Sequence, residues 1–138
     1  MEYVPAPEFY TEIRRLIAFF GWNHLDPDRI RVVRSRGTRS RRILARCHAL
    51  PKALQAGLAI PASYVIEFVS ENYDRLPEAE KTKTLLHELL HIPATFGGGF
   101  RNHDYVRAHR VNRLYERYAK QFPPDAVPSL SQQGLDLS

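Results

Sequence analysis

The sequence lacks the features that would place a chain outside the cell or in a membrane. Its single cysteine, Cys47, excludes an internal disulfide and suits a reducing compartment. No apolar run approaches the roughly 18 residues that a membrane-spanning helix needs. The first residues, Met1 to Pro5, have neither the basic start nor the apolar centre of a signal peptide. We therefore expect a cytoplasmic protein with no membrane partner.

The sequence also has no internal repeat, and its length favours one domain. With 138 residues, 43% of them hydrophobic, the chain can bury a single core but is too short for two. We expect residues 1–122 to form this domain. Residues 123–138 contain three prolines among polar residues and are expected to be a disordered tail.

The most informative motif is the pentapeptide His87-Glu88-Leu89-Leu90-His91. On a helix, two histidines four residues apart lie about 40° apart around the axis, so both can reach one metal ion. Glu88 points to the same side, where a carboxylate can take a proton from metal-bound water. No cysteine accompanies the histidines, which disfavours a closed structural zinc site. The motif therefore predicts a zinc hydrolase.

The residues around the motif separate it from a chance match. A helical projection places the four leucines Leu85, Leu86, Leu89 and Leu90 on one side, and Thr84, His87, Glu88 and His91 on the opposite side. The helix is expected to begin near Pro77, with acidic residues in its first turn, and to stop at or just after His91, ahead of Pro93. The alternative, two histidines on an ordinary surface helix, does not explain this separation.

A zinc hydrolase usually takes three protein ligands and leaves one position for water. The candidates for the third ligand are His103, Asp104, His109 and Glu116. The glycine run 97–99 can turn the chain and bring His103 back over the metal, since each extended residue spans about 3.3 Å. In the helix expected over residues 102–122, His109 and Glu116 face solvent. His103 is the best placed of the four.

Three further residues near His103 have two interpretations each. Asp104 can accept the ring N–H of a ligand histidine, or it can satisfy free N–H groups at a helix start. Arg107 and Arg110 can face the cleft and hold a substrate carboxylate or an oxyanion, although plain surface charge is favoured for both.

Upstream of the motif, the pattern predicts a compact α+β fold. An amphipathic helix is expected from Pro7 to Phe20, ended by Gly21. Strands are expected at Arg29–Ser35, Arg41–Leu50 and Ser63–Ser70, with a hairpin turn at Arg36–Arg39 between the first two. Together with the metal helix and a C-terminal helix that carries the third ligand, these elements make a small zincin-like layer with three to four strands.

We make further predictions for Cys47 and for the segment Tyr64–Val69 of these strands. Cys47 is expected to be a small core residue, not a ligand. In zincins, the strand nearest the metal helix binds the substrate backbone, and Tyr64–Val69 is the candidate for that edge. The alternative is an ordinary paired strand, with Glu67 a solvated side chain.

These residues resemble a known family. The stretch from Lys83 to Asp104, with its histidine motif, glycine run and His103-Asp104 pair, is similar to the phage-type metallopeptidases, which are small zincins. A more distant similarity is to SprT-like proteases, in which a glycine usually follows the third histidine. The resemblance implies a zinc-dependent peptidase with His87, His91 and His103 as ligands and Glu88 as general base. It implies nothing firm about the substrate.

Positive charge is concentrated in one segment. Residues 29–46 contain eight arginines and no acid, while the whole chain carries a net charge of +5. Such a block is typical of a nucleic-acid contact, although it lacks interleaved aromatic residues. Two alternative functions follow: a nucleic-acid-binding accessory protein with a structural or vestigial metal site, and a protease that acts on DNA-associated proteins. A solvated segment is the third interpretation of the charge.

Overall fold

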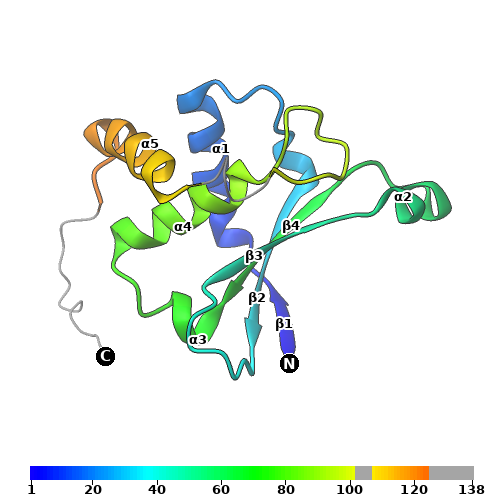
Figure 1. Cartoon of the computed structure of the whole chain (residues 1–138), viewed down its shortest axis with the longest axis horizontal. Coiled ribbons are helices and arrows are strands. Elements are labelled where there is room, and N and C mark those ends of the chain that lie inside the picture. The colour runs from blue at the N-terminus through cyan, green and yellow to red at the C-terminus, as the bar shows by residue number, and fades with distance from the viewer. Residues whose placement is uncertain (102–106, 125–138) are drawn as a thin grey trace.

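Four strands form one mixed sheet, and helices α1, α4 and α5 lie together on one side of it (Figure 1). The structure is a computed structural model that describes residues 1–101 and 107–124. The strand order is β1-β2-β4-β3. The strands are β1 (Glu2–Pro5), β2 (Ile30–Arg36), β3 (Ala45–Ala49) and β4 (Tyr64–Val69). Strands β2 and β4 are parallel, and the two outer pairs, β1 with β2 and β3 with β4, are antiparallel. The predicted α+β class is confirmed.

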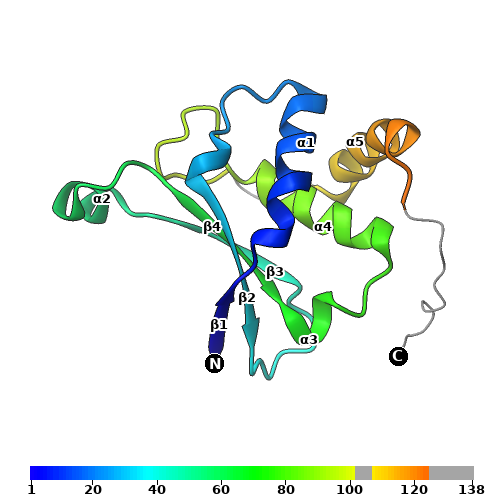
Figure 2. The ribbon, with the colours of Figure 1, turned by 180° about the vertical axis from the view of Figure 1, so that it is seen from behind.

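The helices of the described residues differ in how they contact the sheet. They are α1 (Tyr10–Phe20), α2 (Lys52–Leu58), α3 (Ser70–Tyr73), α4 (Glu78–Leu90) and α5 (Ala108–Gln121), with short 3₁₀ turns at Pro7–Phe9 and Pro27–Arg29. Helix α2 projects beyond the end of the sheet, away from α1, α4 and α5, as the two opposite views show (Figures 1 and 2). It buries none of its residues. No helix of the described residues is long and apolar enough to cross a bilayer.

The core lies between the sheet and the three grouped helices. From the strands it takes Ile30, Val32, Tyr64, Ile66 and Phe68, and from the helices Ile13, Leu16, Leu85, Leu86 and Leu89, all almost fully buried. The alternation of buried residues along β2 and the apolar spacing along α1 follow from the two periodicities of strand and helix. The first helix ends as expected, because Gly21 adopts the left-handed conformation (φ 64°) that closes a helix at low cost.

The expected hairpin between the first two strands is wrong. Strands β2 and β3 do not pair with each other, because β4 lies between them and bonds to both. The physical reason is burial: five of the six residues of β4 are buried, so this strand is stabilised most in the centre of the sheet. The loop at residues 37–44 therefore crosses the end of β4, where Leu44 O accepts a hydrogen bond from Val69 N–H.

The assignment of Tyr64–Val69 as the substrate-binding edge is wrong for the same reason. This segment is β4, and both of its edges are occupied. Glu67 is not solvated either: it is 1% exposed and accepts hydrogen bonds from Arg46 and His48. The exposed edge on the α4 side of the sheet belongs to β3.

Strand β1 and helix α2 were missed from the sequence. All four residues of β1 are exposed, so no alternation marks the strand, and α2 has no buried face that would give it a period. Helix α5 begins at Ala108, later than the expected start at residue 102. Residues 102–106 and 125–138 lie outside the described residues, so neither that start nor the expected tail is tested in full.

Candidate metal centre

Helix α4 carries the histidine motif, and local interactions fix its position. Pro77 occupies the N-cap in an extended conformation. The carboxylates of Glu78 and Glu80 in the first turn stabilise the helix by interacting with the positive end of its dipole. Pairs of Glu78 with Lys81 and of Glu80 with Lys83 support the exposed side, at 3.5 and 3.2 Å. The helix ends at Leu90 with His91 as its C-cap, as the sequence predicted.

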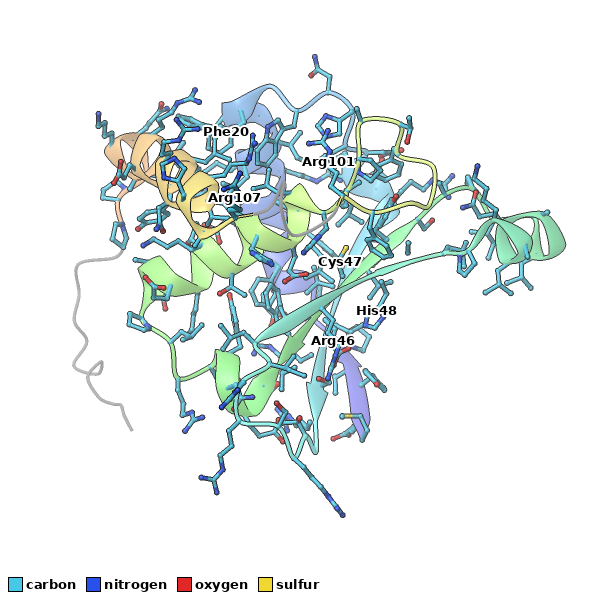
Figure 3. All side chains as sticks on the ribbon, in the orientation of Figure 1. Phe20, Arg46, Cys47, His48, Arg101 and Arg107 are labelled. Carbon is cyan, nitrogen blue, oxygen red and sulfur yellow. The ribbon has the colours of Figure 1, made fainter. Side chains whose placement is uncertain are left out.

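The two sides of α4 separate as expected. Leu85, Leu86, Leu89 and Leu90 are buried in the core, whereas His87 and His91 are half-buried. The two histidines and Glu88 line a pocket of about 430 Å³ between α4, β3 and the loop after α4. Its other lining residues are Ala45, Arg46, Cys47, Phe100 and Arg101. Figure 3 shows Cys47 on the α4 side of β3 and the side chains of Arg46 and His48 on the other side.

The geometry of the two histidines fits a shared metal ion. Their Nε2 atoms lie 3.3 Å apart. Two nitrogens bound at about 2.0–2.1 Å to one tetrahedral zinc are separated by about 3.3 Å. The side chains of His87 and His91 are therefore already at the spacing that a common ligand position requires.

A reciprocal backbone contact orients His91. Its ring Nδ1 lies 2.8 Å from the carbonyl oxygen of Arg101, and the Arg101 N–H donates to His91 O at 2.7 Å. A carbonyl oxygen can only accept, so Nδ1 carries the proton and Nε2 presents its lone pair to the pocket. This is the outer contact that metal-binding histidines usually make.

The glycine loop that leads to Arg101 is held at several points. The Tyr64 hydroxyl donates to Gly99 O at 2.8 Å and accepts from Gly98 N–H at 3.0 Å. The Gln55 amide donates to Gly97 O at 3.3 Å. Gly98 has φ of 105°, and a Cβ there would lie 2.8 Å from Gln55 Nε2 and 3.1 Å from Leu50 O. Only glycine fits this position, in conformation and in space.

The expected third ligand, His103, lies outside the described residues, as does Asp104. Within the described part of the chain, no group of three or more histidine, cysteine, aspartate or glutamate side chains could hold a metal ion. His109 and Glu116 are exposed on α5, as predicted.

The arginines at the start of α5 do not contribute to the pocket. Arg107 is the N-cap residue of α5 and Arg110 lies in its first turn. Neither is among the described residues that line the pocket. Both interpretations of Arg107 and Arg110, surface charge and a contact with substrate, remain predictions.

Glu88 has the properties of a proton-transfer group. It is 6% exposed, and burial raises its pKa to about 7. A carboxyl with a pKa near neutrality can accept and return a proton at low cost. Cys47 differs: burial, with a smaller contribution from the charge of Glu88, raises the pKa of its thiol to about 12. A protonated thiol is a poor metal ligand, which agrees with the expectation that Cys47 serves packing.

The edge of β3 exposes backbone beside the histidines. Leu50 N–H donates to Ser63 O, and Leu44 O accepts from Val69 N–H, so the even-numbered residues of this segment bond inward to β4. In an antiparallel pair the alternate residues point their N–H and C=O groups outward. These are Ala45, Cys47 and Ala49, and Ala45 and Cys47 also line the pocket. The outer edge of β3 can therefore pair with an extended peptide.

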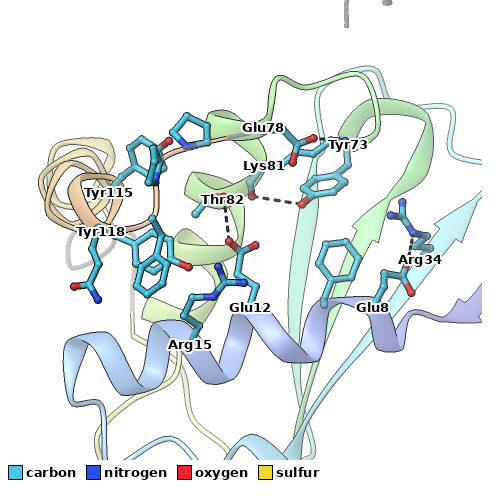
Figure 4. Close-up of a pocket in the computed structure, with 15 residues that line it drawn as sticks. Glu8, Glu12, Arg15, Arg34, Tyr73, Glu78, Lys81, Thr82, Tyr115 and Tyr118 are labelled. Carbon is cyan, nitrogen blue, oxygen red and sulfur yellow. Dashed lines mark hydrogen bonds and ion pairs between the residues drawn. The ribbon is translucent and has the colours of Figure 1, made fainter. Parts of the chain in front are cut away.

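A larger pocket of about 540 Å³ lies elsewhere, between α1, α4 and α5. Figure 4 shows Glu12 from α1 pointing toward Thr82 on α4, whose hydroxyl donates to it at 3.4 Å. Burial raises the pKa of Glu12 above its ordinary value. No histidine of the described residues lines this pocket, so size alone does not identify the chemical site.

Comparison with known families agrees with this geometry. Residues 1–126 match the family model described as "Putative phage metallopeptidase". The chain belongs to this family. The match includes the histidine motif, β3 and the whole of α5, and the description of the family suggests a metal-dependent peptidase. No curated protein and no solved structure matches the chain.

Proposed function

We propose that this phage-type metallopeptidase is a zinc-dependent endopeptidase that cleaves extended peptide segments bound along β3. The observation that carries the proposal is the pairing of two histidine nitrogens 3.3 Å apart with a buried carboxylate whose pKa is about 7. These are the groups that metal-assisted hydrolysis of an amide requires, in one pocket.

The residues have distinct roles in this proposal. His87 and His91 would hold the metal through their Nε2 atoms, and the Arg101 carbonyl keeps the lone pair of His91 in position. When bound, zinc supplies a Lewis acid that lowers the pKa of a water molecule to about 7. Glu88 would accept a proton from the attacking water and return it to the leaving amine.

His103 is the proposed third ligand. It lies two positions after Arg101, whose backbone is fixed to His91 by two contacts, and two extended residues span at most about 7 Å. Elemental analysis of the purified protein tests this assignment. One zinc per chain, lost on His103→Ala and on His87→Ala, is the expected result, whereas zinc retained in His103→Ala would transfer the role to Asp104 or another residue.

The substrate is proposed to add to the sheet as a fifth strand beside β3. The outward N–H and C=O groups of Cys47 would bond to the peptide backbone, because backbone pairing needs no particular substrate sequence. The small side chains of Ala45 and Cys47 line the pocket between this edge and α4. This arrangement replaces β4, the edge expected from the sequence.

Glu88→Gln tests the catalytic role. Glutamine keeps the size of the side chain but cannot accept a proton, so we expect a loss of kcat of at least about 100-fold with zinc content unchanged. The assay follows cleavage of a fluorescein-labelled unfolded protein such as casein. Glu116→Gln, the same change at an exposed position on α5, is the matched control and should keep wild-type activity. Equal cleavage by Glu88→Gln and the wild type would refute the assignment.

A further inference from the structure

Part of the arginine-rich segment, which has no role in the proposed peptidase reaction, forms a loop whose backbone is fixed by hydrogen bonds. Residues 37–44 connect β2 to β3, and their backbone is bonded to α3. Asn72, 5% exposed, donates from Nδ2 to Ser40 O at 3.0 Å and to Ile43 O at 2.8 Å. The Glu71 carboxylate accepts from Gly37 N–H at 2.6 Å. The loop is therefore positioned before any ligand arrives.

Hydrogen bonds within the loop reinforce this position. Ser40 N–H donates to Thr38 Oγ1 at 3.1 Å. The Ser40 hydroxyl in turn accepts from the N–H groups of Arg42 and Ile43, each at 3.2 Å. Such turns lower the conformational entropy that binding would otherwise cost. The arginines on this loop are thus presented from a fixed backbone.

Two of the eight arginines form ion pairs within the fold. Arg34 bonds to Glu8 and Asp74, and Arg46 bonds to Glu67 at 2.9 Å. These charges are compensated within the fold.

The loop arginines behave differently. Arg39, Arg41 and Arg42 are exposed, and no ion pair with them occurs among the described residues. Arg36, also exposed, has Glu71 nearby. Three unpaired positive charges within four residues repel one another, and an external polyanion would relieve that repulsion.

The chemistry of the loop fits phosphate groups in series. The planar guanidinium group binds phosphate oxygens in a bidentate manner, and successive arginines can follow a backbone with regularly spaced charges. The loop exposes no large apolar side chain of its own, since Ile43 and Leu44 are half-buried, so it lacks the groups that insert into a lipid surface.

A neighbouring strand adds an aromatic group. Tyr3 on β1 is 59% exposed and pairs in register with Ser35, next to the loop. An exposed aromatic ring can stack on a nucleic-acid base. The sequence had shown no aromatic residue within the arginine block, because β1 is brought to this place only by the sheet.

We propose that the β2–β3 loop binds the phosphate backbone of nucleic acid through Arg39, Arg41 and Arg42. This function is separate from the proposed peptidase reaction, because the loop lies outside the pocket that contains His87, Glu88 and His91. Binding is expected to be independent of the metal and largely independent of base sequence.

Fluorescence anisotropy with a labelled single-stranded 20-nucleotide DNA, and with its duplex, tests the proposal. The variant replaces Arg39, Arg41 and Arg42 with Gln. The control replaces Lys52, Arg113 and Lys120 with Gln, three exposed residues away from the loop, and has the same net charge. At about 50 mM salt we expect the loop variant to bind roughly 10- to 100-fold more weakly, with a salt slope smaller by about 2 to 3, and the control to bind almost as the wild type.

Several results would overturn the proposal. Equal weakening in both triple variants would show an effect of net charge alone, and unchanged binding in the loop variant would exclude this loop. Binding to vesicles of anionic phospholipid but not to either DNA would assign the loop to a membrane surface. Glu88→Gln and chelator-treated protein should bind DNA normally, so a failure of the proposed peptidase function does not affect this result. Thermal melts should match, because the three arginines make no described ion pair.

Discussion

Tyr64→Phe tests whether the glycine loop controls the metal site. The ring of Tyr64 is fully buried and packs against Phe96, with ring centroids 5.1 Å apart, and phenylalanine keeps that contact. The variant removes only the hydroxyl, which bonds to Gly99 O and Gly98 N–H. The loop would then lose two of the contacts that direct the chain toward Arg101 and His103.

The expected effect follows from these two hydrogen bonds. Each contributes about 0.5–1.5 kcal/mol, and water can partly replace the hydroxyl because Gly99 is exposed, so the loss is about 1–2 kcal/mol. If the metal binds only when the loop is ordered, its apparent dissociation constant rises in inverse proportion to the fraction of the loop that remains ordered. A cost of about 1–2 kcal/mol corresponds to roughly 5- to 30-fold weaker zinc binding.

Competition with a chromogenic chelator at neutral pH measures that dissociation constant. Tyr73→Phe is the matched control, because the Tyr73 hydroxyl contacts Lys81 O at 3.5 Å and lines the other pocket. A double variant with His103→Ala separates the two routes to the metal: the effect of Tyr64→Phe should disappear if it acts through His103 and persist if it acts through His91. Zinc affinity within a factor of about two of wild type in Tyr64→Phe would refute the reasoning.

Two further predictions concern the edge strand β3. Cys47→Pro removes one outward N–H from this edge, a position where proline is tolerated, and should lower kcat/KM by about 3- to 10-fold without loss of zinc. Cys47→Ala, the control, should retain activity. Equal activities of the two variants in peptide hydrolysis would exclude substrate pairing at Cys47. Glu67→Gln should reduce the free energy of unfolding in urea by about 1 kcal/mol at neutral pH, because Arg46, itself one-third exposed, loses its charged partner. Burial raises the pKa of Glu67, but the hydrogen bond from His48 and the charge of Arg46 outweigh it, so the pKa lies below 4.5. The stabilisation is therefore complete above pH 4.5 and lost as the pH falls through the folded-state pKa, and a difference between wild type and variant that persists in acid would contradict this account.

The sequence predicted the parts of the site that depend on one helix. Leucines and histidines separate on α4 because a helix places residues three and four apart on one side, and Pro77 and Pro93 limit its length. The same helical periodicity predicted that Glu88 lies on the side of the histidines and that Glu116 is exposed. These interactions are local, so pattern alone was sufficient.

The strand order could not be predicted in that way. It depends on which strand gains most from burial on both sides, and β4 takes the centre although β2 and β3 are neighbours in the chain. The contacts of Tyr64 and Gln55 with the glycine loop were missed for the same reason, since each joins residues more than thirty positions apart. Nothing in the sequence around Tyr64 distinguishes its hydroxyl from that of any core tyrosine.

The structure also shows which arginines of the basic segment, residues 29–46, form ion pairs and which do not. Counted in sequence, it is a uniform basic segment, but the sheet turns alternate residues to opposite sides and brings Glu67 and Asp74 to two of its arginines. Arg39, Arg41 and Arg42, which form no ion pair among the described residues, lie on the loop, and Arg42 is three residues before Ala45, where β3 begins. Three extended residues span about 10 Å, so a nucleic-acid backbone on the loop would lie beside the end of the proposed substrate edge. The two proposed sites are therefore linked by a single short strand, and the side chains of Arg46 and His48 fix this strand to Glu67 on the side away from α4 (Figure 3).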